Sequence, residues 1–306
     1  MLIALALVML VSLAARTEAA EPFRVDKVQG EYFHFSEGSQ LALRYVFGEV
    51  LIEGVPIDYA RSTYIHPIYS IDGKVLTDDF PKDHYHHRGL SWMWTKVSFD
   101  GVTKDLWGLK GVRQKCKEEW EPKAYDDRAV LTINDGWYED STGRKIIDEV
   151  VTVTVYRADE EGRIFDWELN LAAVDTPVSI DTSDRGYGGF NLRFAPRKDT
   201  TIITSKGPVT GDQDRQRYAW ADLSGRFEGS DEFDGIAIFD NKSNPHYPTG
   251  WTLRNYGILN PAFTSSASAY TIEVDKPLTL KYRVYVHKGK GDPDRLDRMF
   301  WEYNGK

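Results

Sequence analysis

Three of the chain's seven histidines lie in one short stretch, DHYHHRG, which spans residues 83–89. An imidazole titrates near neutral pH, so such a cluster suits general acid–base catalysis. We expect His84 or His87 to transfer a proton, with Asp83 orienting one of the rings. The guanidinium of Arg88 would bind a carboxylate or stabilise an enolate-like oxygen, as in proton abstraction next to a carbonyl. The alternative is that these histidines are loop residues bonded to the backbone.

The same histidines could instead bind a metal ion. In an extended chain, His84 and His86 would point to one face and His87 to the other. Two imidazoles at this spacing can bind one first-row metal ion, which would activate water or a substrate oxygen. The third ligand would come from elsewhere, such as His66 or His287. The spacing is not a specific metal signature, so both interpretations stay open.

Other polar and aromatic side chains are candidates for the same site. Arg61 would assist in stabilising an anion, and Trp92, Trp94 or Trp251 would offer a flat surface to a sugar ring. The glycine-rich stretch 185–193 and the stretch 240–257 add tyrosine and arginine, although their glycines and prolines could serve only turns. The candidate catalytic residues are His84, His86, His87, Arg88, His66 and Arg61. The candidate substrate-binding residues are Tyr64, Tyr187, Arg193, Trp251, Arg254 and His287, and the possible metal ligands are His84, His86 and His66.

Several other classes of site are not indicated. The patterns GxSxG, GKS/T and GxGxxG are absent, so we expect neither a serine nucleophile of that kind nor a nucleotide cofactor. Adjacent strand residues face opposite ways, so we interpret the acidic pairs 78–79, 118–119 and 126–127 as solvated turns rather than a glycosidase pair. The single cysteine, Cys116, excludes an intrachain disulfide and is interpreted as structural. His34 is expected to be an ordinary strand residue.

Short strands at regular spacing predict the fold. Period-two alternation or β-branched runs occur at 41–47, 129–134, 147–156, 164–171, 201–204, 235–239, 270–274 and 278–286. Turn residues separate them, which indicates an all-β antiparallel sandwich. One short helix is expected in DPDRLDRMFWEYN near the C-terminus, with Asp292 or Asp294 as its N-cap. The stretches 59–89 and 185–229 lack clean alternation and are expected to be long functional loops.

The first twenty residues, MLIALALVMLVSLAARTEAA, are typical of a signal peptide, with cleavage after Ala19 or Ala20. An uncleaved anchor is the alternative, because no Lys or Arg precedes the apolar run. We therefore expect an exported protein, periplasmic or extracellular, with one domain at residues 21–306 and no stable membrane insertion after cleavage. The net charge of −9 argues against nucleic acid and anionic membranes as partners.

Four segments resemble one family of bacterial secreted proteins that automatic labelling calls methane oxygenase PmoA. They are residues 61–94, which include DHYHHRG, then RGYGGFNLRF, GIAIFDNKSNPHYPTGWTLRNYG and LKYRVYVHKG. The resemblance implies a β-sandwich similar to the galactose mutarotase superfamily, and its matching positions are Arg61, His66, His84, His86, His87, Arg88, Arg193, Arg254 and His287. The multi-span helical architecture of the true methane monooxygenase subunit is not predicted here, so the sequence argues against methane oxidation.

Three hypotheses about function follow. The first is an exported enzyme that carries out acid–base chemistry on a sugar or uronate, as a lyase, epimerase or hydrolase. The second is a metal-dependent enzyme that uses the same histidines. The third is a non-catalytic carbohydrate-binding sandwich, in which aromatic residues would provide the affinity and the histidines would be dispensable.

Overall fold

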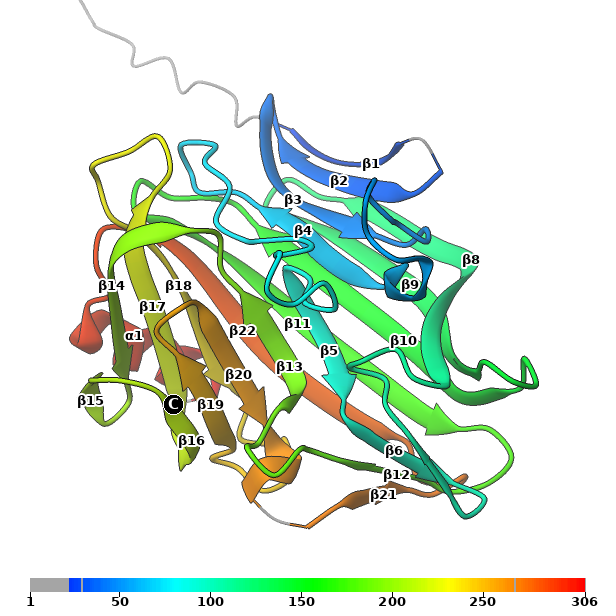
Figure 1. Ribbon diagram of the computed structural model, residues 1–306. Helices are drawn as coiled ribbons and strands as arrows, with labels where there is room; N and C mark the ends of the chain where they lie inside the picture. The colour runs from blue at the N-terminus through cyan, green and yellow to red at the C-terminus, as the bar shows by residue number, and fades with distance from the viewer. Residues whose placement is uncertain (1–21, 29, 267, 306) are drawn as a thin grey trace, which may run out of the picture.

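The computed structural model describes residues 22–28, 30–266 and 268–305 (Figure 1). The predicted signal peptide at residues 1–20 lies outside the described residues. Almost all regular structure in the described part is β-strand, arranged in antiparallel sheets, which confirms the predicted fold class. The described residues include no helix long and apolar enough to cross a membrane.

Two nine-stranded sheets and one four-stranded sheet account for the strands of the described residues. The first sheet runs, in spatial order, β1 (Phe23–Val28), β2 (Tyr32–Glu37), β3 (Gln40–Val46), β4 (Tyr64–Ile68), β5 (Leu90–Trp94), β13 (Gly188–Arg193), β20 (Ile258–Ala262), β19 (Gly250–Arg254) and β16 (Gln213–Arg217). The second runs β15 (Gly207–Val209), β14 (Arg197–Thr204), β17 (Trp220–Phe227), β18 (Asp234–Asp240), β22 (Leu278–Lys288), β11 (Gly162–Ala173), β10 (Lys145–Tyr156), β9 (Arg128–Glu139) and β8 (Val112–Ala124). The small sheet runs β21 (Tyr270–Ile272), β12 (Val178–Asp181), β6 (Lys96–Phe99) and β7 (Val102–Lys104). The helical elements are η1 (Ile57–Tyr59), η2 (Phe263–Ser266) and α1 (Pro293–Tyr303).

The core lies between the two large sheets. Strand β10 shows how the sequence builds it, because its valines at 151, 153 and 155 are buried while the threonines between them are half-buried on the other face. Indole rings fill the space beneath the first sheet, where the Trp92 and Trp167 ring centroids lie 4.3 Å apart. One face of each large sheet therefore packs in the core, and the opposite face can contact loops or a helix.

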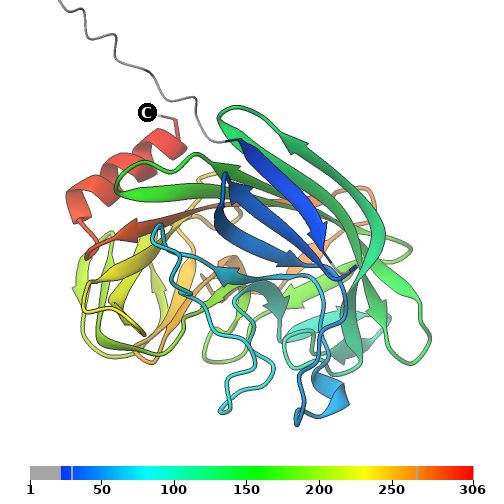
Figure 2. The ribbon, with the colours of Figure 1, turned by 90° about the horizontal axis from the view of Figure 1, so that it is seen from above.

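The outer faces of the two sheets differ. Helix α1 covers the second sheet, where Leu296 and Phe300 pack on Trp220 and Phe239. Asp292 caps α1 by accepting hydrogen bonds from the amides of residues 294 and 295, which confirms this N-cap prediction. Long loops between residues 47 and 89 extend from the first sheet on the opposite side of the molecule from α1 (Figure 2).

Each predicted strand lies within or overlaps an observed strand, but the two long irregular stretches were partly misjudged. The stretch 59–89 contains β4 and is otherwise mostly loop, as expected. The stretch 185–229, in which only 201–204 was predicted as a strand, instead contains β13 to β17. Strand β13 has no polar alternation because all of its residues are buried, those of one face by the core and those of the other by loops. Cys116 lies in β8 and packs against the core.

Candidate functional site

The stretch 83–89 forms two consecutive turns rather than an extended strand. The amide of His84 donates to the carbonyl of Pro81, and the amide of His87 donates to the carbonyl of His84, both at 2.9 Å. The predicted placement of His84 and His86 on one face, away from His87, is therefore wrong. The His84 and His87 rings stack at 4.9 Å, and the ring of His86 stands nearly perpendicular to that of His87 at 4.6 Å. The turns thus bring all three imidazoles together.

Arg88 stabilises this loop through hydrogen bonds to its backbone. Its fully buried guanidinium donates to the backbone carbonyls of Tyr59, Tyr85 and His87. Its Nε also lies 3.2 Å from Oδ1 of Asp79. With its donors directed at the protein, Arg88 positions the histidines, which corrects its predicted role in binding an anion.

The acidic pairs also depart from the prediction of solvated turns. The carboxylate of Asp79 is largely buried, and burial raises its pKa to about 6 despite the opposing charge of Arg88. Residues 118 and 119 lie in β8 rather than in a turn. Only the pair at 126–127 lies in a bend, between β8 and β9.

Arg61 has a similar structural role in a neighbouring loop. It is buried and donates to the carbonyls of Leu106 and Trp107 at 2.6 and 2.8 Å. Burial, together with the charge of Arg88, lowers the pKa of Arg61 to about 9. Arg61 therefore fixes the backbone that carries Trp107, which corrects its predicted role beside Arg88. The Trp107 ring lies 5.6 Å from the His87 ring and 5.8 Å from the Tyr187 ring.

The three histidines border a pocket of about 400 Å³ on the outer side of the first sheet. The pocket is lined by His84, His86, His87, Thr95, Trp107, Ser183, Arg185, Tyr187, Asp212, Arg254 and Tyr256. Five of these, the histidines with Tyr187 and Arg254, were predicted from the sequence. Trp107, Asp212 and Tyr256 were not singled out. Trp107 could have been found from the sequence DLWG at 105–108, in which a tryptophan stands next to a turn glycine.

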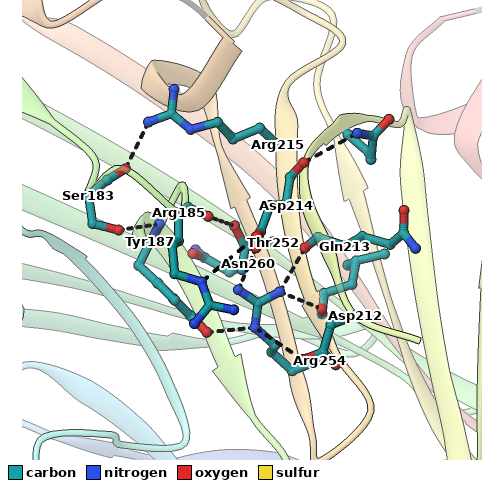
Figure 3. A network of polar contacts seen from close by, with 12 residues as sticks. Ser183, Arg185, Tyr187, Asp212, Gln213, Asp214, Arg215, Thr252, Arg254 and Asn260 are labelled. Carbon is teal, nitrogen blue, oxygen red and sulfur yellow. Dashed lines mark hydrogen bonds and ion pairs between the residues drawn. The ribbon is translucent and has the colours of Figure 1, made fainter.

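Arg254 and Tyr187 form one wall of the pocket (Figure 3). Nε of Arg254 donates to the Tyr187 hydroxyl at 2.6 Å, and Nη1 donates to the carbonyls of Gln213 and Leu253. Nη2 pairs with the carboxylate of Asp214. Every nitrogen of this guanidinium thus has a protein partner. Arg254 therefore holds the Tyr187 hydroxyl at the pocket, and its own predicted role in substrate binding stays a prediction.

A chain of charged contacts also reaches the pocket lining, where it ends at His84. Nη2 of Arg193 donates to both oxygens of Asp83 at 3.1 and 3.2 Å, and Asp83 lies 3.0 Å from Nδ1 of His84. Burial alone would raise the pKa of Asp83, but its contacts with His84 and Arg193 outweigh this and lower it. A carboxylate that accepts from Nδ1 leaves Nε2 of the imidazole to accept a proton. This is the geometry of an oriented acid–base group. Arg193, predicted to bind substrate, acts here through Asp83.

The two inner histidines are uncharged at neutral pH. Burial, and then the positive charges of Arg61 and its neighbours, lower the pKa of His86 to about 4. Burial and the nearby His86 lower the pKa of His87 to about 2. Both rings therefore combine one N–H donor with one unprotonated nitrogen. Nδ1 of His87 is buried without a hydrogen-bond partner among the described residues.

A row of polar side chains crosses the first sheet on the same side as the pocket. Ser91 pairs with Asn191 across β5 and β13, and Asn260 pairs with Thr252 across β20 and β19. All four are completely buried. The register of β13 with β20 places Asn191 opposite Asn260. Neither amide atom of Asn191 has a hydrogen-bond partner in the described part of the protein. Loops thus bury polar groups on this face, which is unlike the apolar face beneath it.

Other candidate residues lie outside the pocket lining. The Tyr64 hydroxyl donates to Asp79, and His66 contacts the Thr77 hydroxyl at 3.0 Å. Burial lowers the pKa of His66 to about 3. His287 lies 2.7 Å from Asp222 and borders a different cavity of about 30 Å³. The structure therefore does not place these three predicted residues in the lining of the histidine pocket.

The predicted tryptophan platforms are also corrected. Trp92, Trp94 and Trp251 are completely buried and belong to the core. A sugar ring cannot stack on a side chain that has no exposed surface. Their strand positions explain this, since each lies on the face of the first sheet that contacts the second. Trp107 lines the pocket, but it also packs in the core and only 5% of its surface is exposed.

The metal hypothesis depends on a ligand set that the described residues do not assemble. His84 and His86 have ring centroids 5.5 Å apart, but the proposed third ligands are engaged elsewhere. In the described part of the chain, no three His, Cys, Asp or Glu side chains are arranged to hold a metal ion.

Comparison with known proteins assigns the chain to a family. A family model described as "Family of unknown function (DUF6807)" matches residues 33–300. The chain belongs to this family. The description of DUF6807 contains no methane-oxygenase name, so the resemblance to proteins carrying that label stays a prediction. No curated protein matches the sequence.

Two solved structures show distant similarity to this DUF6807 member. One is a GH36 α-galactosidase from Geobacillus stearothermophilus in complex with raffinose, with 12% identity and a TM-score of 0.40 over 90% of this chain. The chain spans 40% of the length of that enzyme. The other is a GalM/aldose epimerase homologue from C. elegans, with 10% identity and a TM-score of 0.33, covering 89% of this chain and all of that one. Scores this low do not establish a shared activity.

Proposed function

We propose that the histidine pocket binds a carbohydrate and that His84 is its acid–base group. The observation that carries this proposal is the oriented Asp83–His84 pair at the pocket, with His86 and His87 packed beside it. The half-exposed His84 is accessible to a ligand, whereas the two inner rings are mostly buried. The reaction would be proton transfer at a sugar carbon or oxygen, of the lyase, epimerase or hydrolase type.

The pocket lining supports a sugar as the ligand. Tyr187, Tyr256, Ser183 and Thr95 provide hydroxyl groups, and Trp107, which is 5% exposed, adds a small apolar surface. A sugar presents many hydroxyl groups around an apolar ring face, so this combination is complementary to it. A volume of about 400 Å³ is within the range of small-molecule sites. With the predicted signal peptide, the proposal extends to an exported protein that meets its substrate outside the cytoplasm.

The experiment is a screen of neutral and uronate-containing glycans for lyase, epimerase and hydrolase products, with the wild type and a matched pair of variants. His84→Asn is expected to lower turnover about 10²- to 10⁴-fold, because it removes the acid–base group. Asp83→Asn is expected to lower it less, since it removes only the orienting carboxylate. His246→Asn is the control, because His246 is exposed and lies outside the pocket lining.

Each alternative has its own outcome in this screen. Loss of activity on chelation, restored by a divalent metal, would support the metal hypothesis instead. Glycan binding without turnover, unchanged in His84→Asn and lost in Trp107→Ala, would indicate a non-catalytic binding module. Equal turnover by His84→Asn and His246→Asn would overturn the assigned role of His84.

A further inference from the structure

The arginines around the pocket differ in whether their guanidinium groups are already bonded. Arg61 donates through Nη2 to two backbone carbonyls, Arg88 also donates to backbone carbonyls, and Arg254 donates to Tyr187, Asp214 and two carbonyls. Arg185 is different. Its side chain is 66% exposed, and its Nε forms a long ion pair with the carboxylate of Asp214 at 3.8 Å. Among the described residues, no hydrogen bond from its guanidinium is present, so its donors remain available to a ligand.

The backbone of Arg185 is nevertheless firmly held. Its carbonyl accepts a hydrogen bond from the Thr252 hydroxyl at 2.9 Å (Figure 3). The turn that contains it is closed by hydrogen bonds from Gly186 to Ser183 and from Ser183 to Tyr187, both at 2.9 Å. Gly186 has a φ of +84°, and a Cβ there would come within 2.8 Å of the Thr252 hydroxyl oxygen. A free side chain on a fixed backbone is suited to ligand binding, because little main-chain entropy is lost on binding.

The electrostatic environment of the pocket favours an anion. The nearby basic side chains Arg61, Arg88 and Lys110 all lower the pKa of His86. The lining itself holds two guanidinium groups, those of Arg185 and Arg254, and one carboxylate, that of Asp212. This local excess contrasts with the net charge of −9 of the whole chain. A negatively charged ligand would therefore be attracted to the pocket although the protein as a whole would repel it.

We propose that the substrate is an acidic sugar and that Arg185 binds its carboxylate. The inference rests on the proposed function, and it specifies the substrate class of the same pocket as a uronate. A guanidinium forms two parallel hydrogen bonds to a carboxylate, which gives both affinity and orientation. Arg185 then positions the sugar so that its polar ring substituents face the tyrosines and the histidine cluster.

The test compares acidic oligosaccharides with their neutral esters. Oligomers of galacturonate, glucuronate and mannuronate, each as the free acid and as the methyl ester, are titrated into the full protein by calorimetry. The wild type is expected to bind one free acid about 10- to 100-fold more tightly than its ester. Arg185→Ala is expected to remove this preference and leave ester binding unchanged. Arg185→Lys should retain part of the preference for the free acid, because a lysine keeps the positive charge but lacks the two parallel N–H donors of a guanidinium.

Arg24→Ala is the matched control. Arg24 has a 58% exposed side chain, and its Nε lies 3.7 Å from an aspartate, so its charge and exposure resemble those of Arg185 away from the pocket. Equal affinity for acid and ester, or an Arg185→Ala variant that behaves like Arg24→Ala, would overturn the carboxylate assignment while sugar binding stands. If neither these oligomers nor neutral glycans bind the wild type, the proposed function itself fails.

Discussion

Asp83–His84 and Asp222–His287 are both aspartate–histidine contacts, at 3.0 and 2.7 Å, yet their surroundings differ. The side chains of the first pair are 51% and 45% exposed, and that of His84 lines the pocket. Those of the second pair are 1% and 4% exposed. An accessible pair can exchange protons with a ligand, whereas a buried pair mainly holds structure. The comparison shows that the contact alone does not define a catalytic group, because accessibility decides what it can do.

The buried pair is also more extensively bonded. Asp222 accepts from the Ser224 hydroxyl at 2.7 Å, and that hydroxyl accepts from the amide of Gly291 at 3.0 Å. Nδ1 of His287 contacts the carbonyl of Lys288 at 3.1 Å. Burial alone would lower the pKa of His287, but the charge of Asp222 and the hydrogen bond to it raise the pKa instead. This pair therefore joins β17, β22 and the chain that leads to α1.

The largest expected effect is on stability at the buried pair. His287→Ala leaves the carboxylate of Asp222 buried without its partner, so we expect a loss of about 3–5 kcal/mol in the free energy of unfolding. Urea denaturation of the variant and the wild type measures this difference. A loss below about 1 kcal/mol would contradict the structural role of the pair.

The two histidine regions are expected to affect stability with opposite dependence on pH. His87 has a lowered pKa in the folded protein, so the unfolded chain binds an extra proton below pH 6.5 and stability falls as the pH is lowered. His287 has a raised pKa, so its contribution is complete below pH 6.5 and is lost as the pH rises through that raised pKa.

Denaturation of His87→Gln and His287→Gln across pH 4–9 tests this contrast. Relative to the wild type, His87→Gln should lose less stability toward acid pH, by up to about 1.4 kcal/mol per pH unit. The gap between His287→Gln and the wild type should instead narrow toward alkaline pH. Parallel curves for both variants would show that these pKa shifts do not contribute to folding.

The smallest expected effect is the change in the free energy of unfolding caused by His84→Asn. Because the His84 side chain is 45% exposed, its replacement should change the free energy of unfolding by no more than about 0.5 kcal/mol. The same variant is expected to lose turnover, so stability and activity separate at this residue. A loss comparable to that of His287→Ala would mean that the pocket pair, too, is structural.

The sequence by itself determined several of the strands, the helix and its cap, and the presence of a histidine cluster at 83–89. These features are local, because period-two alternation, an N-cap aspartate and a histidine cluster can all be recognised in a few neighbouring residues. The same local view explains the error over β13, whose residues are buried on both faces and so show no alternation.

Only the tertiary structure decided which residues form the pocket and which support it. Arg88 and Arg61 have guanidinium groups of the kind that bind anions, but in the folded protein these groups are buried and donate to backbone carbonyls. Trp251 has a side chain suited to stacking on a sugar but is completely buried in the core. Trp107 also packs in the core and borders the pocket with only 5% of its surface exposed, whereas Arg185, which is distant in sequence from the histidines, reaches the pocket with an exposed side chain. The physical reason is that accessibility and hydrogen-bond satisfaction depend on long-range packing, which local sequence patterns do not encode.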